Sequence, residues 1–406
     1  MPPNSRYSEN MDFLNKGLRS LAGPLLASAL FVVSASAQTL KVEAMPNPAG
    51  AGSSQASWSA TKAGDPLMSW VETAKDGSYA LEYATRHNGQ WSAAHVIAAH
   101  RHFFRHPAEL PEVIALNDGT LVAHWIETPG AEESEAEFIY ASTSHDGTTW
   151  TKPVMVNHDT TQIQHGLASI VASGDHEASI VWLEAPKGED FPAYLMRTVV
   201  DASGTVKSEE KLDPNVCTCC PTSVVRTAKG LLIAYRGATP QDIRDITIMR
   251  FEGGKWLPAK TVFPDGWKLN ACPTNAASAS ANGDQVAVAW YTAAAGKPRV
   301  EFAASKDSGA TFTKPALVST GSAYGYVSSV VNSDGSATVS WLERGPQGAR
   351  VLARVVSAAG VMGPVTEVAK GTRKGVGYPR LLQAGGETLI AWGSADSKLE
   401  TAKLSK

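Results

Sequence analysis

A strand that ends in an aromatic residue recurs seven times along this chain of 406 residues, and this repeat restricts the fold more than any other feature. A turn and an apolar strand precede it, as at Asn117-Asp118-Gly119, and two alternating strands follow. Four short strands in roughly fifty residues form the blade of a β-propeller. The sequence therefore predicts an all-β, seven-bladed β-propeller. The seven aromatic residues, 51 to 57 positions apart, are Trp70, Trp125, Trp182, Tyr235, Trp290, Trp341 and Trp392.

The two ends of the repeat region suggest how the ring closes. The seventh repeat stops at Lys406 after about three strands, while residues 40–44 form an unassigned strand near the other end. If this N-terminal strand completes the last blade, the ring has no free edge. We expect residues 38–406 to form this one domain. An all-β sandwich is the alternative, but a sandwich does not repeat a tryptophan at a fixed period.

Residues 1–37 have the order of a secretory signal peptide. Lys16 and Arg19 form a basic region, residues 21–33 form an apolar stretch, and Ala35-Ser36-Ala37 is a cleavage site. The stretch is too short for a permanent transmembrane helix, and no later segment is long enough to span a membrane. We therefore expect a periplasmic or secreted protein without a membrane span.

The charge pattern excludes one class of partner. The formal net charge is −3, and basic residues are scattered among acidic ones. A nucleic-acid-binding protein would instead gather its basic residues on one face. The expected partners are a small polar ligand, a metal ion or another protein.

Two turns carry a recognisable motif. Residues 305–312 read S-K-D-S-G-A-T-F, and residues 144–150 read S-H-D-G-T-T-W. In such a turn the aspartate accepts backbone hydrogen bonds, the glycine adopts a positive φ and the aromatic ring packs between strands. Both turns resemble the Asp box, and the chain resembles the BNR/Asp-box propellers, a superfamily that includes the sialidases. The motif indicates the fold and not the chemistry.

The resemblance implies an exo-sialidase as one candidate function. Sialidases have six blades, bind the substrate carboxylate with three arginines and use a Tyr–Glu pair as the nucleophile. Here Glu109 falls in the position of the first arginine, and Arg380 after Tyr378-Pro379 does not complete a set of three with Arg226 and Arg236. We therefore expect no sialoside cleavage, and a glycoside hydrolase is kept as an alternative.

The cysteines are the most unusual local feature. Residues 217–222 read C-T-C-C-P-T, and Cys272 begins a second C-P-T segment. Aligning blades four and five places Cys220 and Cys272 at the same point, where the innermost strand begins. These points from successive blades ring one mouth of the central channel. The other blades place Glu109, His165, Tyr324 and Tyr378 there.

Three interpretations of the cysteines are open. The one that we favour is disulfides, because an exported protein with an even number of cysteines commonly forms them. The second is a metal site of Cys217, Cys219, Cys220 and Cys272, with His165 as a further ligand. Sulfur ligands favour copper or zinc there. The third is a redox-active dithiol.

These observations favour a binding protein whose ligand or metal site lies at the channel mouth. Glu109, Tyr324, Tyr378 and Arg380 are the candidate ligand-binding residues. An enzyme needs paired carboxylates or an activated nucleophile there, and only Glu109 with Tyr324 or Tyr378 offers that. The third hypothesis is a protein-interaction scaffold in which the disulfides are structural.

Overall fold

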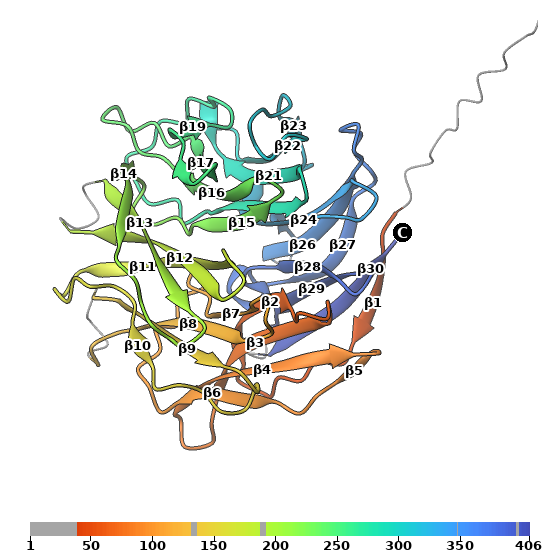
Figure 1. Ribbon diagram of the computed structural model, residues 1–406. Helices are drawn as coiled ribbons and strands as arrows, with labels where there is room; N and C mark the ends of the chain where they lie inside the picture. The colour runs from red at the N-terminus through yellow and green to blue at the C-terminus, as the bar shows by residue number, and fades with distance from the viewer. Residues whose placement is uncertain (1–38, 131–135, 187–191, 347, 395–397) are drawn as a thin grey trace, which may run out of the picture. The chain divides into compact units, whose positions relative to one another are not determined.

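The computed structural model describes residues 39–130, 136–186, 192–346, 348–394 and 398–406. They belong to the unit from residue 37 onward, where the strands form seven antiparallel sheets (Figure 1). The predicted signal peptide, residues 1–37, lies outside the described residues. In the part of the chain that the structure describes, no helix has both the length and the apolar character needed to span a membrane.

The first four blades follow one another along the chain. Blade 1 contains β2 (Ser54–Ala60), β3 (Pro66–Thr73), β4 (Tyr79–His87), β5 (Gln90–Trp91) and β6 (His95–Ala99). Blade 2 contains β7 (Glu112–Ala115), β8 (Leu121–Glu127), β9 (Phe138–Ser144) and β10 (Val154–Met155). Blade 3 contains β11 (Gln164–Ala172), β12 (Glu177–Ala185), β13 (Ala193–Asp201) and β14 (Glu210–Val216). Blade 4 contains β15 (Ser223–Thr227), β16 (Gly230–Arg236), β17 (Ile246–Glu252), β18 (Lys255–Trp256) and β19 (Lys260–Thr261).

The last three blades complete the ring. Blade 5 contains β20 (Ala277–Asn282), β21 (Gln285–Thr292), β22 (Arg299–Ser305) and β23 (Ala316–Leu317), with a 3-10 turn at Ala294–Gly296. Blade 6 contains β24 (Ala323–Val331), β25 (Ala337–Gly345), β26 (Gly348–Val356) and β27 (Thr366–Gly371). A short helix, α1 (Arg373–Val376), leads into blade 7, which contains β28 (Arg380–Ala384), β29 (Glu387–Gly393), β30 (Leu399–Ser405) and β1 (Lys41–Met45).

The N-terminal strand closes the last blade. β1 pairs antiparallel with β30, from Lys41 opposite Ser405 to Met45 opposite Thr401, at the outer edge of blade 7 (Figure 1). Leu40 is buried just before this pairing begins. The predictions of seven blades and of closure by the N-terminal strand are therefore confirmed.

The core lies between the blades. The innermost strands contact one another in the order β2, β7, β11, β15, β20, β24 and β28, and β28 returns to β2. Seven hydrophobic clusters among the described residues each join mainly two neighbouring blades. The alternating strands bury side chains on both faces in this way, and the innermost strands are left to line the channel.

The repeated aromatic residues form an internal framework. In blade 6 the indole N–H of Trp341 donates to Glu343 across 3.1 Å. Trp70 and Trp125 make the same bond to the glutamate two positions on, at 2.9 and 2.5 Å. All three indoles are fully buried, and each finds its acceptor within its own blade. Trp182 and Trp290 differ: the first has no hydrogen-bond partner among the described residues, and the second donates to Asp265 at 2.8 Å. We call the Trp-x-Glu pattern of blades 1, 2 and 6 the Trp-x-Glu framework.

The Asp-box turns have the predicted local structure. Asp146 accepts hydrogen bonds from the backbone of Thr148 at 2.7 Å and of Thr149 at 2.6 Å, and these lower the pKa of its carboxyl group. Gly147 has a φ of +75°, a conformation that other residues rarely adopt. Both Asp boxes connect the third and fourth strands of a blade, away from the channel.

Candidate functional site

The channel mouth is the ring formed by the starts of the seven innermost strands. Cys220 comes three residues before β15, and Glu109 three residues before β7. Tyr378 comes two residues before β28, whereas His165 and Tyr324 are each the second residue of an innermost strand. The mouth is therefore built from segments that are far apart in the sequence.

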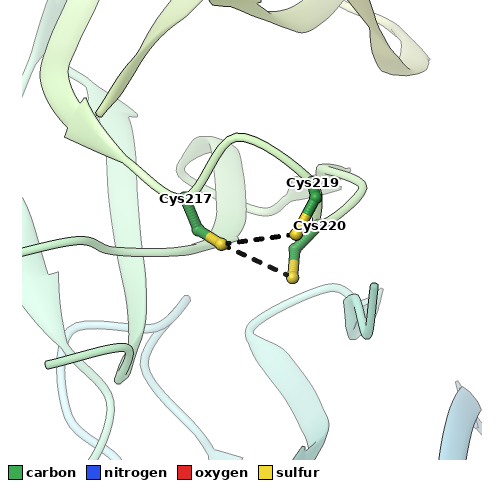
Figure 2. A group of neighbouring side chains, drawn as sticks. All are labelled: Cys217, Cys219 and Cys220. Atoms are coloured by element: carbon green, nitrogen blue, oxygen red, sulfur yellow. Dashed lines mark hydrogen bonds between the residues drawn. The ribbon is translucent and has the colours of Figure 1, made fainter. Parts of the chain in front are cut away.

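Three cysteines in the loop between β14 and β15 form what we call the thiol cluster (Figure 2). Their sulfur atoms all lie within 4.8 Å of one another. The Sγ atom of Cys217 lies 3.8 Å from those of Cys219 and Cys220, and Figure 2 shows the three side chains pointing toward one another. Cys272 reaches this loop from blade 5: its sulfur lies 3.9 Å from the Thr218 hydroxyl, and its thiol interacts with Cys219.

The expected disulfides are not present. None of the four cysteines forms a disulfide bond. The two shortest sulfur–sulfur distances given above, 3.8 Å, far exceed the S–S bond length of about 2.05 Å. The side chains converge on a common space instead of pairing. Three converging sulfur atoms could bind a metal ion, or two of them could form a disulfide bond after a small movement.

Backbone contacts on several sides hold the cysteine loop. The amide of Cys217 donates to the Arg236 carbonyl at 2.9 Å, at the end of β16. Gln164 Nε2 donates to the Thr218 carbonyl at 3.0 Å, and the Thr222 amide donates to Leu167 at 3.1 Å. These bonds join blades 3 and 4. The positions of the thiols are therefore determined by two blades and not by a flexible turn.

A buried arginine lies next to the thiol cluster. Arg236 is 1% exposed, and in the described part of the chain its guanidinium makes no ion pair. It lies 4.9 Å from the ring centroid of Trp267. Its N–H groups donate to the carbonyl oxygens of Arg244, Asn275 and Tyr291, at 2.7, 3.1 and 2.9 Å for the shortest bond to each. A buried cation without a carboxylate is costly, and a nearby anion would offset that cost.

The thiols of the cluster differ in their acidity. Hydrogen bonds from Cys219 and then Cys220 hold the pKa of Cys217 well below its usual range, and the positive charge of Arg236 lowers it further. Burial raises the pKa of Cys220 to about 12. Cys217 is therefore the thiol that ionises first. A thiolate is the form of cysteine that attacks electrophiles and binds metals.

His165 is turned away from the cysteines. It is fully buried, and its Nδ1 lies 3.4 Å from the Glu184 carboxylate on the neighbouring strand β12. Its ring stacks on Phe138 at 5.8 Å. The only metal-ligand group found among the described residues consists of Cys217, Cys219 and Cys220, so the structure does not bring His165 to it.

Glu109 is buried between blades 2 and 3. Its Oε1 accepts the backbone N–H of Leu167 at 2.6 Å, and burial raises its pKa to about 8. A β-carbon added at Gly166 would lie 2.8 Å from this oxygen and 1.9 Å from Oε2 of Glu137. Two buried carboxyl groups therefore approach the same point, and only glycine fits between them. Sequence reasoning did not identify Glu137.

The tyrosines of the mouth have partners of their own. The Tyr378 hydroxyl donates to the carbonyl of Thr274 in blade 5, and its ring lies 4.1 Å from that of Tyr326. Arg373 lies over the ring of Tyr324 at 5.0 Å. No hydrogen bond between Glu109 and either predicted tyrosine occurs among the described residues. The pairing of carboxylate and tyrosine that an enzyme would need is therefore not formed.

The channel itself contains a cavity of about 200 Å³ lined by residues of all seven innermost strands. Within it, Arg380 lies 3.7 Å from the Glu112 carboxylate. Arg236 points into blade 5, and Arg226 makes only a 3.4 Å bond to the Ala172 carbonyl. The three arginines that the sequence offered for a sialidase site therefore have separate partners.

The comparisons with known proteins agree with the fold. The sequence profile of the BNR repeat-like domain matches residues 68–390. This chain belongs to the BNR repeat-like family. No curated protein sequence matches this BNR-repeat protein significantly.

Several solved structures resemble this BNR-repeat protein at low sequence identity. The BP39L lectin from Burkholderia pseudomallei is 11% identical, with a TM-score of 0.58 over 87% of this chain and 96% of its own. A polysaccharide lyase of family 25, an ulvan lyase, is 11% identical, with a TM-score of 0.56 over 89% and 93%. A Dyadobacter fermentans protein of unknown function is 14% identical, with a TM-score of 0.50 over 90% and 97%. At such identities the likeness shows the fold alone.

One signal for the role of Arg236 was present in the sequence. The residue after the repeated aromatic is apolar in blades 1, 2, 3 and 6, and is Arg236 in blade 4. A charged residue at a core position of a repeat needs a special environment. The sequence did not show that this environment adjoins the thiol cluster.

Proposed function

We propose that this BNR-repeat protein is an exported binding protein that holds a soft metal ion, Cu(I) or Zn(II), on the thiol cluster at the channel mouth. The observation that carries the proposal is the convergence of three free thiols within 4.8 Å of one another, with Cys272 beside them. Cysteine sulfur is the ligand type that favours these two ions.

The spacing of the sulfur atoms fits such an ion. Tetrahedral zinc–sulfur bonds of about 2.3 Å place ligand sulfurs about 3.8 Å apart. Cys217 lies at this distance, 3.8 Å, from both Cys219 and Cys220. A trigonal or tetrahedral site would therefore require little movement of the loop. Cys272, which interacts with Cys219 but lies outside this group of three, would have to move closer to act as a fourth ligand.

The charge of the surroundings also suits bound thiolates. Arg236 supplies a buried positive charge, and its pull on Cys217 favours the ionised form that a metal requires. Cys272 is exposed and Cys219 half-buried, so one side of the site is open to solvent. An open side allows an ion to enter and to leave.

Two competing hypotheses are a redox-active dithiol and a carbohydrate-directed function. Export would place the thiols in an oxidising compartment, where a dithiol could cycle with a disulfide. A carbohydrate-directed function is suggested by the lectin and the polysaccharide lyase among the structural neighbours. It would need carboxylates or arginines that face a ligand, and here the carboxyl groups of Glu109 and Glu137 are buried against Gly166 and the three arginines have other partners.

The test is metal analysis of the mature protein purified without oxygen or chelators. We expect about one ion of copper or zinc per chain, and Cys217→Ser and Cys220→Ser should lower the content at least tenfold, since each removes a central ligand. Bicinchoninate competition reports Cu(I), and a zinc-sensitive dye reports Zn(II). Ser278→Ala, at a channel-lining position, is the matched control and should retain the metal.

Thiol counting separates the outcomes. Metal-loaded protein should show four reactive thiols after chelation and denaturation. Protein that binds neither ion after anaerobic reconstitution would rule the proposal out. If it also shows no free thiols before reduction, the disulfide interpretation takes its place.

A further inference from the structure

A second site is indicated by the one blade in which the repeated tryptophan is not fully buried. The five tryptophans at this repeat position in blades 1, 2, 3, 5 and 6 are 0 to 1% exposed. Trp392 of blade 7 is only half-buried. The glutamate that follows two positions later in the Trp-x-Glu framework is replaced by Ser394, after Gly393. Blades 4 and 5 also lack this glutamate, with Gly237 and Thr292 in its place, so blade 7 is set apart by the exposure of its indole.

A cavity of about 430 Å³ lies beside this indole, between blades 7 and 1. Trp392 and Tyr378 line it from blade 7, and Gln55 lines it from the start of blade 1. The segments around Arg105 and Lys374 complete its walls. A cavity of this size with aromatic walls is typical of small-molecule sites.

The charged side chains that line this cavity in the described part of the chain are of one sign. Arg105, Lys374 and Lys398 line it, and none of the described lining residues is an aspartate or glutamate. None of these three cations forms an ion pair within the described residues. His106 also lines the cavity, and burial lowers its pKa, so it adds little charge at neutral pH.

The overall charge of the protein does not explain this grouping, because the formal net charge is −3. The neighbouring channel cavity is also different, since its Arg380 faces Glu112 at 3.7 Å. The cavity between blades 7 and 1 therefore has positive charge without a carboxylate partner among the described residues, beside an accessible indole; the Arg105 guanidinium also lies 4.0 Å from the centroid of the Tyr79 ring. The ligand that satisfies both is an anion that also carries a ring.

We propose that this cavity binds a small ring-bearing carboxylate, with the ring against Trp392 and the carboxylate among Arg105, Lys374 and Lys398. Arginine and lysine donate charge-assisted hydrogen bonds to carboxylates. An indole face provides an apolar surface for a flat ring or for the apolar face of a sugar. The proposal does not depend on the thiol cluster, which contributes no residue to the cavity.

The test uses two pairs of probes and titration calorimetry. Benzoate is compared with benzyl alcohol, and glucuronate with glucose, so that the charge is varied for each ring type. We expect at least one carboxylate to bind at least tenfold more tightly than its neutral partner, and its affinity to fall as salt is raised. The pair that responds identifies the ring as aromatic or as a sugar.

Variants locate the binding. Trp392→Ala and Lys374→Gln should each weaken the carboxylate at least fivefold. Ser394→Glu restores the framework glutamate and adds a negative charge, so it should also weaken carboxylate binding. Trp256→Ala in blade 4 is the control and should bind normally. Metal content should be unchanged in every one of these variants, which separates this result from the test of the thiol cluster.

Some outcomes would overturn the proposal. One is no detectable binding of either carboxylate at millimolar concentration. Another is equal binding of charged and neutral partners. Unchanged carboxylate binding in a folded Trp392→Ala variant would show that the anion binds elsewhere.

Discussion

The Trp-x-Glu framework and the channel mouth use similar residues in opposite ways. In the framework, a buried polar group finds its partner within its own blade, as Trp341 does with Glu343. At the mouth, partners come from other blades: Glu109 of blade 2 accepts from Leu167 of blade 3, and Tyr378 of blade 7 donates to Thr274 of blade 5.

This difference separates stability from function. Contacts within a blade repeat with the sequence and build each sheet. At the mouth, the contacts between blades differ from one blade to the next, so each position has a different residue and a different environment. Four groups with strongly shifted pKa values, Cys217, Cys220, Glu109 and Tyr378, lie at or beside the mouth. Such groups are typical of functional sites.

The largest effect on stability is expected for the tryptophan of an intact framework blade. Trp341→Ala should lower the free energy of unfolding by about 3–5 kcal/mol, because it leaves a cavity in a packed core. Trp392→Ala, at the same repeat position in blade 7, should cost less than about 2 kcal/mol, since its indole is already partly in water. Guanidinium denaturation of both variants measures the contrast. Equal losses would mean that blade 7 does not depart from the framework in energy.

The fold could be predicted because each blade is one copy of the sequence repeat. Each blade must bury a strand of similar pattern, so the seven aromatic residues and the N-terminal strand were sufficient to predict seven blades and their closure. Boundaries within blades were less predictable, since β5, β10 and β18 contain only two residues each.

The site could be predicted only in part. The alignment of blades places Cys220 and Cys272 at one rim, but it does not give the direction of a side chain. His165 illustrates the limit: it lies in β11, yet its ring turns into the blade toward Glu184. Arg236 illustrates the same limit from the other side. Its position in the repeat shows that it is unusual, but its role depends on the cysteine loop beside it, which the repeat does not place. Contacts between blades depend on side-chain direction, which a repeat pattern does not encode.

A smaller effect is expected for a framework glutamate. Glu343 is 1% exposed and accepts hydrogen bonds from Trp341, from Thr320 and from Arg350. Glu343→Gln removes charge-assisted bonds and should cost about 1–3 kcal/mol of unfolding free energy. Glu367→Gln is the matched control, because Glu367 is an exposed partner of the same Arg350 at 3.7 Å. The control should cost less than about 1 kcal/mol. A control variant as unstable as Glu343→Gln would contradict the role of burial.

The effect of the same substitution at the mouth depends on pH. Burial raises the pKa of Glu109 from 4.5 to about 8, so the folded protein keeps its proton at pH 7 while the unfolded chain loses it. Between pH 4.5 and about pH 8, the two pKa values of Glu109, unfolding releases a proton. The free energy of unfolding therefore falls as pH rises, by up to about 1.4 kcal/mol per pH unit. Glu109→Gln cannot ionise and is similar in shape to the protonated acid. Its stability relative to the natural protein should rise steadily from pH 5 to pH 8.

Glu112 provides the control with the opposite sign. Burial alone would raise the pKa of Glu112, but His124 and Arg380 outweigh it and hold the pKa below its usual value. Its contribution is therefore already complete above about pH 5, and Glu112→Gln should cost the same at pH 6.5 and pH 8. Denaturation curves at pH 5, 6.5 and 8 for both variants make the comparison. A constant difference for Glu109→Gln across this range would mean that Glu109 is already ionised in the folded state. The mouth would then hold a buried carboxylate on the backbone N–H of Leu167, in place of a buried acid.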